Sequence, residues 1–197
     1  MQYFDSLPKL VYTDQNGTSS IRTNLLARSS ILPSIFNNPL LYYQYDLHDG
    51  DTPEIVAYKY YGDSYRYWIV LFANQLLDPQ WNWPLDSNSF NAYMTDKYGD
   101  EDVYGTVHHY EKVVTETNYD GTTTNTVTVD EETYNLITTS TNTYTLPTGQ
   151  VTVTIGKKAV SIFDYELGIN EAKRTINILN NNYVDQLETE FVKLMSK

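Results

Sequence analysis

The stretch HDGDTPEIVAYKYYGDSYRYWIVLFAN, residues 48–74, carries the clearest structural signals of the sequence. It contains Asp49-Gly50-Asp51, which is typical of a tight turn, followed by residues that mark the start of a helix. Thr52 can serve as the N-cap, and Pro53 fits the first helical position because its missing N–H would be unpaired there anyway. Gly62 can end the helix in the left-handed conformation, so the stretch predicts a turn followed by a short helix.

A second helix is expected after Gly62, with Asp63 or Ser64 as its cap. Apolar residues at steps of three and four give this helix one buried face. They are Tyr65, Trp68, Ile69 and Phe72. A short aromatic strand is expected just before the stretch, in LYYQYD at residues 41–46. A strand, a helix, a turn and a second helix therefore make up the predicted centre of the fold.

The segment QWNWPLD, residues 80–86, interrupts the helical pattern and leaves Trp81 and Trp83 in a loop. Their alternate positions place both indoles on the same side of an extended loop, where they could anchor a protein interface. The alternative that one or both fold back onto the helices stays open, and stacking on sugar rings is a less favoured third interpretation. A third helix is expected from about residue 86 to 99.

Two segments flank the expected helical core at residues 41–102. Residues 1–40 show few periodic signals and are expected to form an extended arm, which would wrap the chain or become ordered on a neighbouring subunit. Residues 103–164 alternate Thr, Val and Tyr with period two, which predicts antiparallel β-hairpins with turns at Asp120-Gly121 and at residues 147–149. Threonine on one face suits a projecting sheet with one side in water.

The last segment, residues 165–197, is expected to hold a final strand at residues 173–179 and a C-terminal helix. Apolar residues of that helix are spaced three, four and three apart, which makes a narrow seam that would dock on another surface. With the two tryptophans they are the candidate protein-interface residues: Trp81, Trp83, Val184, Leu187, Phe191 and Leu194. The sequence as a whole predicts an α+β fold.

The composition argues against several kinds of partner. A formal net charge of -12 would repel a phosphate backbone, so nucleic acid is not expected as a partner. A membrane partner is not expected either, because no apolar run reaches 18 residues and the N-terminus does not resemble a secretory signal. The lack of cysteine removes disulfides and thiolate chemistry. The 19 tyrosines favour interfaces that are partly wet, although tyrosine also takes the place of phenylalanine in cores.

The sequence shows no motif of catalysis or phosphate binding, such as G-x-S-x-G, a Gly-rich phosphate loop or H-E-x-x-H. The histidines are His48, His108 and His109. The last two are adjacent on an expected strand and would point to opposite faces, so they are not expected to bind one metal together. Asp49 and Asp51 fit turn and cap chemistry better than a cation site. We therefore expect no catalytic residue, no cofactor, no metal and no enzyme activity.

The central stretch resembles a LysM module. The resemblance rests on the following residues: Gly50-Asp51-Thr52, Val56-Ala57, Tyr61-Gly62, Leu71, Asn74 and Leu77-Asp78-Pro79. The strand that usually closes such a module is replaced by QWNWPLD at residues 80–86. This resemblance implies a small strand-helix-helix core.

Over residues 42–196 the chain is similar to the LysM-containing baseplate wedge subunit of T4-like contractile-tailed bacteriophages. The similarity rests on these residues: Tyr42-Tyr43, Asp51-Thr52-Pro53-Glu54, Tyr61-Gly62-Asp63, Tyr67-Trp68-Ile69-Val70-Leu71, Asn74, Asp78-Pro79, Tyr165-Glu166, Asn170-Glu171, Lys173-Arg174, Ile176 and Ile178. Residues 103–163 match least and could serve a contact specific to one lineage.

The similarity implies a structural, late protein of the virion that joins neighbouring wedges around the hub and tube while the baseplate assembles in the host cytoplasm. Its implied partners are other wedge proteins, and hub or tube proteins in addition. We expect the arm and the last helix to become ordered on those partners. The alternative is a LysM module that binds peptidoglycan or a chitin-like glycan, and a tail-associated wall hydrolase is a third, less favoured hypothesis.

Overall fold

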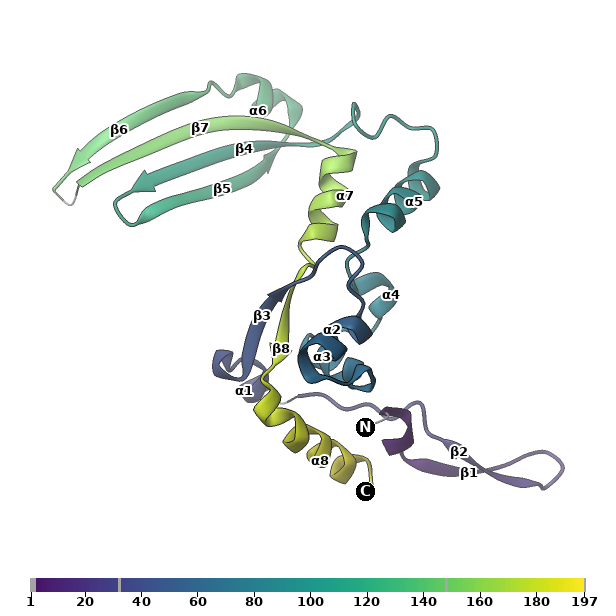
Figure 1. Cartoon of the computed structure of the whole chain (residues 1–197). Coiled ribbons are helices and arrows are strands. Elements are labelled where there is room, and N and C mark those ends of the chain that lie inside the picture. Colours follow the sequence, from purple (N-terminus) through teal and green to yellow (C-terminus); the bar gives the residue numbers. More distant parts are fainter. Residues whose placement is uncertain (1–2, 32, 148, 197) are drawn as a thin grey trace. The chain divides into compact units, whose positions relative to one another are not determined.

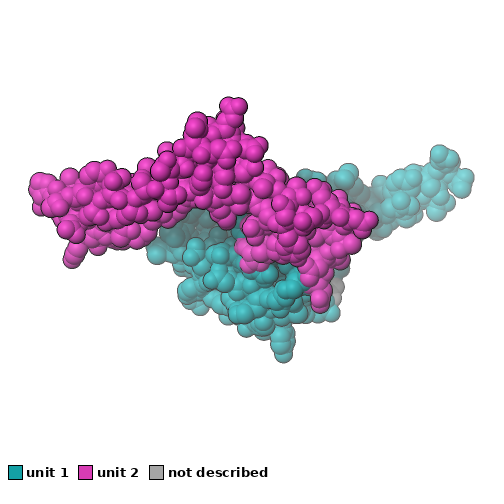
Figure 2. Space-filling view, turned by 90° about the horizontal axis from the view of Figure 1, so that it is seen from above, with its two compact units in different colours: residues 1–87, 172–197 teal, residues 88–171 magenta. Residues whose placement is uncertain are grey.

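The computed structural model describes residues 3–31, 33–147 and 149–196 (Figure 1). The described chain combines helices with antiparallel sheets and ends in a helix, which confirms the expected fold class at this level. Two compact units are present, and Figure 2 colours them separately. Unit 1 comprises residues 1–87 and 172–197, and unit 2 comprises residues 88–171. The finer division into four sequence segments stays a prediction.

Unit 1 is built on a two-stranded antiparallel sheet of β3 (Tyr42–Asp46) and β8 (Thr175–Leu179), in which Tyr42 lies opposite Leu179. Helices α2 (Pro53–Tyr61) and α3 (Tyr67–Ala73) follow β3 in the chain. The core of the unit joins side chains from the helices, β8 and the C-terminal helix. Its largest fully buried side chains are Val56, Ile69, Val70, Ile178 and Val184.

Asn74, just after α3, fastens this helix to β8. Its amide Nδ2 donates to the carbonyl oxygens of Val70 (2.8 Å) and Asn177 (2.7 Å), and its Oδ1 accepts from the Asn177 N–H (2.8 Å). The hydroxyl of Tyr61, at the end of α2, donates to the carbonyl oxygen of Leu179 at 3.1 Å. Each of these bonds satisfies a backbone group that would otherwise be buried without a partner.

The expected ends of the first helix are confirmed. Thr52 accepts a hydrogen bond from the Ile55 N–H through its side chain, and Gly62 has a left-handed φ of 71°. Asp63 caps a 3-10 turn, η3 (Ser64–Arg66), which leads into α3, so the second helix begins later than its cap suggests. The third expected helix is α5 (Ser87–Tyr98), within the predicted bounds.

The N-terminal segment is more structured than the expected extended arm. It contains a β-hairpin of β1 (Lys9–Thr13) and β2 (Ser19–Thr23). The sequence did not predict this hairpin, because two five-residue strands are too short to stand out by periodicity. The other elements of unit 1 are η1 (Tyr3–Ser6), α1 (Pro33–Phe36), η2 (Pro39–Leu41), α4 (Pro79–Asn82), η4 (Asn181–Tyr183) and α8 (Val184–Met195).

Unit 2 contains a four-stranded antiparallel sheet with the order β5-β4-β7-β6. The strands are β4 (Val107–Asn118), β5 (Gly121–Val129), β6 (Ser140–Leu146) and β7 (Gly149–Ser161). The β4–β5 turn lies at the expected place, whereas the turn expected at residues 147–149 includes Thr148, which lies outside the described residues. Helices α6 (Glu131–Leu136) and α7 (Ile162–Glu171) were not anticipated from the sequence.

Threonines form two rows across this sheet. The strand registers align Thr124, Thr115, Thr154 and Thr141 in one row and Thr122, Thr117, Thr152 and Thr143 in the next. Hydroxyl pairs within the rows are hydrogen-bonded, for example Thr117 to Thr122 at 3.1 Å and Thr143 to Thr152 at 3.1 Å. Cross-strand pairs of this kind stabilise a sheet whose face is in water.

A buried carboxylate joins the helices of unit 2. Glu166 on α7 accepts hydrogen bonds from Lys97 Nζ (2.7 Å), Tyr98 OH (2.8 Å) and Tyr93 OH (3.2 Å), all from α5. Burial alone would raise the pKa of Glu166, but the bonds from Lys97 and the tyrosines lower it below its ordinary value. The carboxylate therefore stays ionised and holds α7 against α5.

We expect Gly62→Ala to lower the free energy of unfolding of unit 1 by about 1 kcal/mol, because a side chain disfavours the left-handed backbone at this position. Urea unfolding followed by tryptophan fluorescence measures unit 1 specifically, since Trp68, Trp81 and Trp83 all lie in it. Gly62→Asn is the matched control and should lose less stability, since asparagine tolerates this conformation. Equal losses in the two variants would contradict the argument.

Candidate functional site

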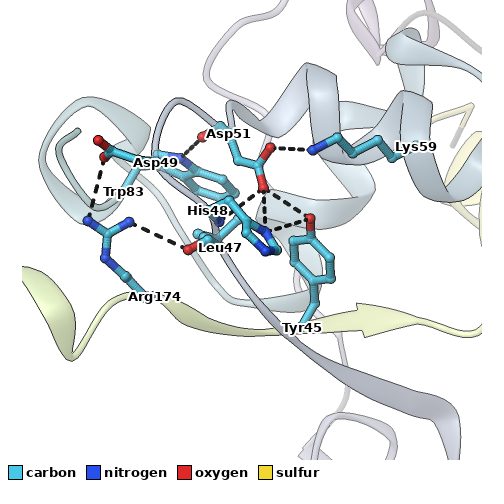
Figure 3. A network of polar contacts seen from close by, with 8 residues as sticks. All are labelled: Tyr45, Leu47, His48, Asp49, Asp51, Lys59, Trp83 and Arg174. Carbon is cyan, nitrogen blue, oxygen red and sulfur yellow. Dashed lines mark hydrogen bonds and ion pairs between the residues drawn. The ribbon is translucent and has the colours of Figure 1, made fainter. Parts of the chain in front are cut away.

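A network of polar contacts fixes the turn between β3 and α2 (Figure 3). The Asp51 side chain is only 5% exposed, and its Oδ2 accepts from the Tyr45 hydroxyl (3.0 Å) and the His48 N–H (3.1 Å). Its Oδ1 accepts from Lys59 Nζ at 2.6 Å. The turn is thus tied to the strand before it and to the helix after it.

The same turn binds the tryptophan loop and the approach to β8. Trp83 is buried, and its indole N–H donates to the carbonyl oxygen of Asp51 at 2.8 Å. Asp49 accepts from the Ser87 hydroxyl at 2.7 Å and lies 3.7 Å from Nη2 of Arg174. Both aspartates therefore serve the fold.

Burial alone would raise the pKa of Asp51, but three hydrogen bonds outweigh this effect and lower the pKa below its ordinary value. The donors are Lys59, the backbone of His48 and the Tyr45 hydroxyl. The carboxylate is therefore held in its charged form as an anchor. Raising rather than lowering its pKa would be the usual route to a general acid, so this environment favours a structural role.

The two histidines of β4 lie differently from the prediction. His108 Nδ1 and His109 Nδ1 are 2.9 Å apart, because a bulge in β4 between Val107 and His109 turns neighbouring side chains toward each other. The expectation that they point to opposite faces was wrong. The His108 ring also stacks on Tyr165, with ring centroids 3.8 Å apart. Over the described part of the chain, no group of three or more His, Cys, Asp or Glu residues is placed to hold a metal ion.

The two tryptophans of the loop have separate environments. Trp81 is 62% exposed on α4, whereas Trp83 packs into the core of unit 1. The alternative in which a tryptophan folds back thus describes Trp83, and Trp81 keeps a surface that a partner can reach. Lys173 Nζ donates to the carbonyl oxygen of Trp81 at 2.8 Å, which connects this loop to the start of β8.

Some apolar residues of helix α8 are buried in unit 1, and others remain exposed on its surface. Val184, Phe191 and Met195 are buried in unit 1, and the Phe191 ring lies 4.9 Å from Trp68 and 5.2 Å from Tyr3, measured between centroids. The expectation that this helix becomes ordered only on a partner is corrected, because its own chain already holds it. Leu187 is half-buried, and Leu194 is 54% exposed.

An ionic contact adds to the docking of α8. Arg66 Nε lies 3.2 Å from Glu188 Oε1, and its Nη2 lies 2.9 Å from Asp185 Oδ1. Burial alone would lower the pKa of the guanidinium, but Glu188 and Asp185 raise it, so the group stays charged.

A groove of about 520 Å³ runs beside α8, and its lining is mostly apolar. It is formed by Ser30, Ile31, Ile35, Leu41, Tyr42, Phe72, Leu179, Tyr183, Gln186, Leu187, Glu190, Phe191 and Leu194. The Tyr42 hydroxyl is buried and finds no hydrogen-bond partner among the residues that the structure describes. The groove is the candidate interaction site because a partner that covers its mostly apolar lining removes that surface from water.

Sequence reasoning found Leu187, Phe191 and Leu194 of this groove but missed its other wall. Ile31 and Ile35 come from a segment without periodicity, and Tyr42 was assigned only to a strand. The run of apolar residues around Pro33 was the available signal, since such residues in an otherwise polar segment need a surface to cover.

No helix within the described ranges is both long enough and apolar enough to cross a membrane. A protein-family model described as Base plate wedge protein 53 matches residues 28–194. This range includes both strands of the β3–β8 sheet and every residue that lines the groove. A search of the curated proteins finds no match.

We expect Asp51→Asn to lower the free energy of unfolding at pH 7 by about 1–3 kcal/mol, because the bond from charged Lys59 is weakened. The pKa of Asp51 is lowered in the folded chain, so the stabilisation exists above the ordinary value of 3.8 and is lost as the pH falls through the folded pKa. Denaturant unfolding between pH 7 and pH 2 should show the free energies of unfolding of the two proteins converging as the pH falls below the folded pKa of Asp51. Asp5→Asn, on an exposed residue of the same unit, controls for the loss of one charge.

Proposed function

Because the chain belongs to the Base plate wedge protein 53 family, we propose that it joins neighbouring wedges around the hub and tube of a contractile phage tail while the baseplate assembles. The family is one of structural phage baseplate proteins, which implies a place in the virion tail and contacts with other baseplate components. The joining of wedges, assembly in the host cytoplasm and the T4-like character of the tail belong to the proposal. The family match over residues 28–194 is the observation that carries it.

The groove beside α8 is the surface through which we propose that assembly occurs. Its lining is mostly apolar, and Leu194 at its rim is exposed in the isolated chain, so a partner that covers them removes apolar surface from water. The groove is also preformed, because α8 is held by Phe191 and by the Arg66 contacts. A preformed surface binds at a lower entropic cost than a segment that must fold on its partner.

Trp81 is the second contact that we propose. An exposed tryptophan offers a large rigid surface with one hydrogen-bond donor, a combination that is common where binding energy is concentrated. Trp83, Val184 and Phe191 contribute in another way, since their burial holds the α4 loop and α8 in place.

We also propose that unit 1 contains a LysM-like core. The chain order β3, α2, α3 and β8, with the two strands antiparallel, supports this assignment. The closing strand that is replaced at residues 80–86 would then be supplied by β8, after the insertion of unit 2. The family match gives no support to the alternative of a glycan-binding module.

We expect Leu194→Asp to reduce incorporation of the protein into tail baseplates about tenfold or more, because the change places an unpaired charge in an apolar contact. Incorporation is measured by quantitative mass spectrometry of baseplates purified after complementation with each variant. Val192→Asp is the matched control: it lies two residues away on the same helix, is partly exposed and does not line the groove. Circular dichroism should show both variants folded.

The proposal for the groove would be wrong if folded Leu194→Asp entered baseplates as well as the wild-type protein does. Phe191→Asp is a poorer test of the same surface, since Phe191 is buried and its replacement would disturb the fold of unit 1 before any contact is tested.

A further inference from the structure

The N-terminal hairpin, formed by β1 and β2, lies before the region that matches the family model, which starts at residue 28. Within the described chain these strands form a sheet of their own with no further strand. Val11 and Ile21 are directly opposite each other and are 73% and 77% exposed. An isolated two-stranded hairpin is marginal in water, so this one gains stability if another surface covers the pair.

The hairpin is nevertheless well anchored at its base and its turn. Leu7 is buried in the core of unit 1, and the Asn24 N–H donates to the carbonyl oxygen of Pro8 at 2.8 Å. Asp14 Oδ1 accepts from the N–H groups of Asn16 (2.9 Å) and Thr18 (2.8 Å). These bonds shape the hairpin as a ribbon that can be presented to another subunit.

The two faces of the hairpin differ. On the face opposite to Val11 and Ile21, the Arg22 guanidinium lies over the Tyr12 ring at 3.8 Å from its centroid, and its Nε donates to Ser20 at 3.3 Å. Those contacts cover part of that face within the hairpin. The Val11–Ile21 face carries Lys9, whose Nζ donates to Thr23 at 3.0 Å. This second face therefore has one exposed apolar pair at its centre, a lysine at one end and the hydrogen-bonded hydroxyls of Thr13 and Ser19 at the other.

The charge of the chain is divided unevenly. Residues 1–28 contain three basic and two acidic side chains, whereas residues 29–197 contain ten basic and twenty-three acidic ones. The arm is thus slightly positive and the remaining chain strongly negative. Opposite charges of this kind favour contact between the arm of one copy and the body of another.

The groove beside α8 has the features that complement this face. Leu187, Leu194 and Ile35 offer apolar surface. Glu190 is an acidic lining residue that pairs with Lys193 at 2.9 Å, and this exposed ion pair can be exchanged at little cost for one with the lysine of the hairpin.

We propose that the N-terminal hairpin of one copy of this chain docks Val11 and Ile21 into the groove beside α8 of a second copy, with Lys9 facing Glu190. The inference rests on the proposed function, since it names the occupant of the groove. Hairpin and groove are different surfaces, so the contact is heterologous, and repeated copies form a ring if the rotation closes. Such a contact would link equivalent subunits around a baseplate.

The natural chain has no cysteine, so single cysteines report on this contact without background from other thiols. Ile21→Cys is mixed with Leu194→Cys as two separate full-length proteins of different tag size, and the mixture is oxidised. We expect a mixed dimer on a non-reducing gel. Val192→Cys replaces Leu194→Cys in the control, since Val192 is exposed on the same helix but outside the groove. The control should give several-fold less mixed dimer.

The experiment is run on the concentrated protein and on isolated baseplates that contain both variants. Absence of the mixed dimer in both samples, or equal yields with Val192→Cys, would overturn the proposal. A chain carrying both Ile21→Cys and Leu194→Cys tests the remaining arrangement. If it forms its disulfide as a monomer, the hairpin occupies its own groove and the proposal is wrong.

A charge exchange tests the register. Lys9→Glu on the hairpin chain should lower the yield of mixed dimer about two- to fivefold, as expected for a contact at the rim of an interface. Glu190→Lys on the groove chain should restore it. The two proposals can fail separately. If Leu194→Asp lowers incorporation into baseplates but the cysteine pair gives no mixed dimer, the groove binds another baseplate protein and the hairpin proposal alone is wrong.

Discussion

The antiparallel pairing of β3 with β8 is the constraint on which unit 1 depends. It joins two segments that are far apart in the sequence, and Asn74 and Tyr61 fasten α3 and α2 to β8 through its backbone. Since the Leu47 N–H also donates to the carbonyl oxygen of Arg174, the ladder continues to the start of the Asp51 turn. Unit 2 is inserted between the halves of this arrangement, so its length can vary while the two strands still pair.

Each unit uses one buried carboxylate to join helices or turns. In unit 1, Asp51 accepts hydrogen bonds from Tyr45, His48 and Lys59. In unit 2, Glu166 accepts them from Lys97 and two tyrosines. In both cases desolvation is outweighed by hydrogen bonds that favour the charged form. An acidic chain thus uses part of its negative charge for internal structure, and tyrosine hydroxyls supply many of the donors. This accounts for some of the 19 tyrosines without any catalytic role.

Helix α8 serves the fold and the surface at once. Its buried side chains pack on Trp68 and Tyr3, and its remaining apolar residues form one wall of the groove. The rest of the lining comes from Ser30, Ile31 and Ile35 of the N-terminal segment and from Leu41, Tyr42, Phe72, Leu179 and Tyr183 of the elements around the β3–β8 sheet.

The sequence by itself determined the local elements whose signals are contiguous: the Thr52 cap, the Gly62 end, the helix at Ser87 and the alternating strands of unit 2. Spacing also picked out Val184 and Phe191 of α8, which are buried, but it chose the exposed Leu194 where the buried residue is Met195. Only the tertiary structure decided which distant residues each of these elements contacts. Trp81 and Trp83 are alike in the sequence, yet one is exposed and the other donates to Asp51, because burial depends on distant segments. The bulge that brings His108 to His109 and the pairing of β8 with β3 likewise arise from contacts between segments, which no local pattern contains.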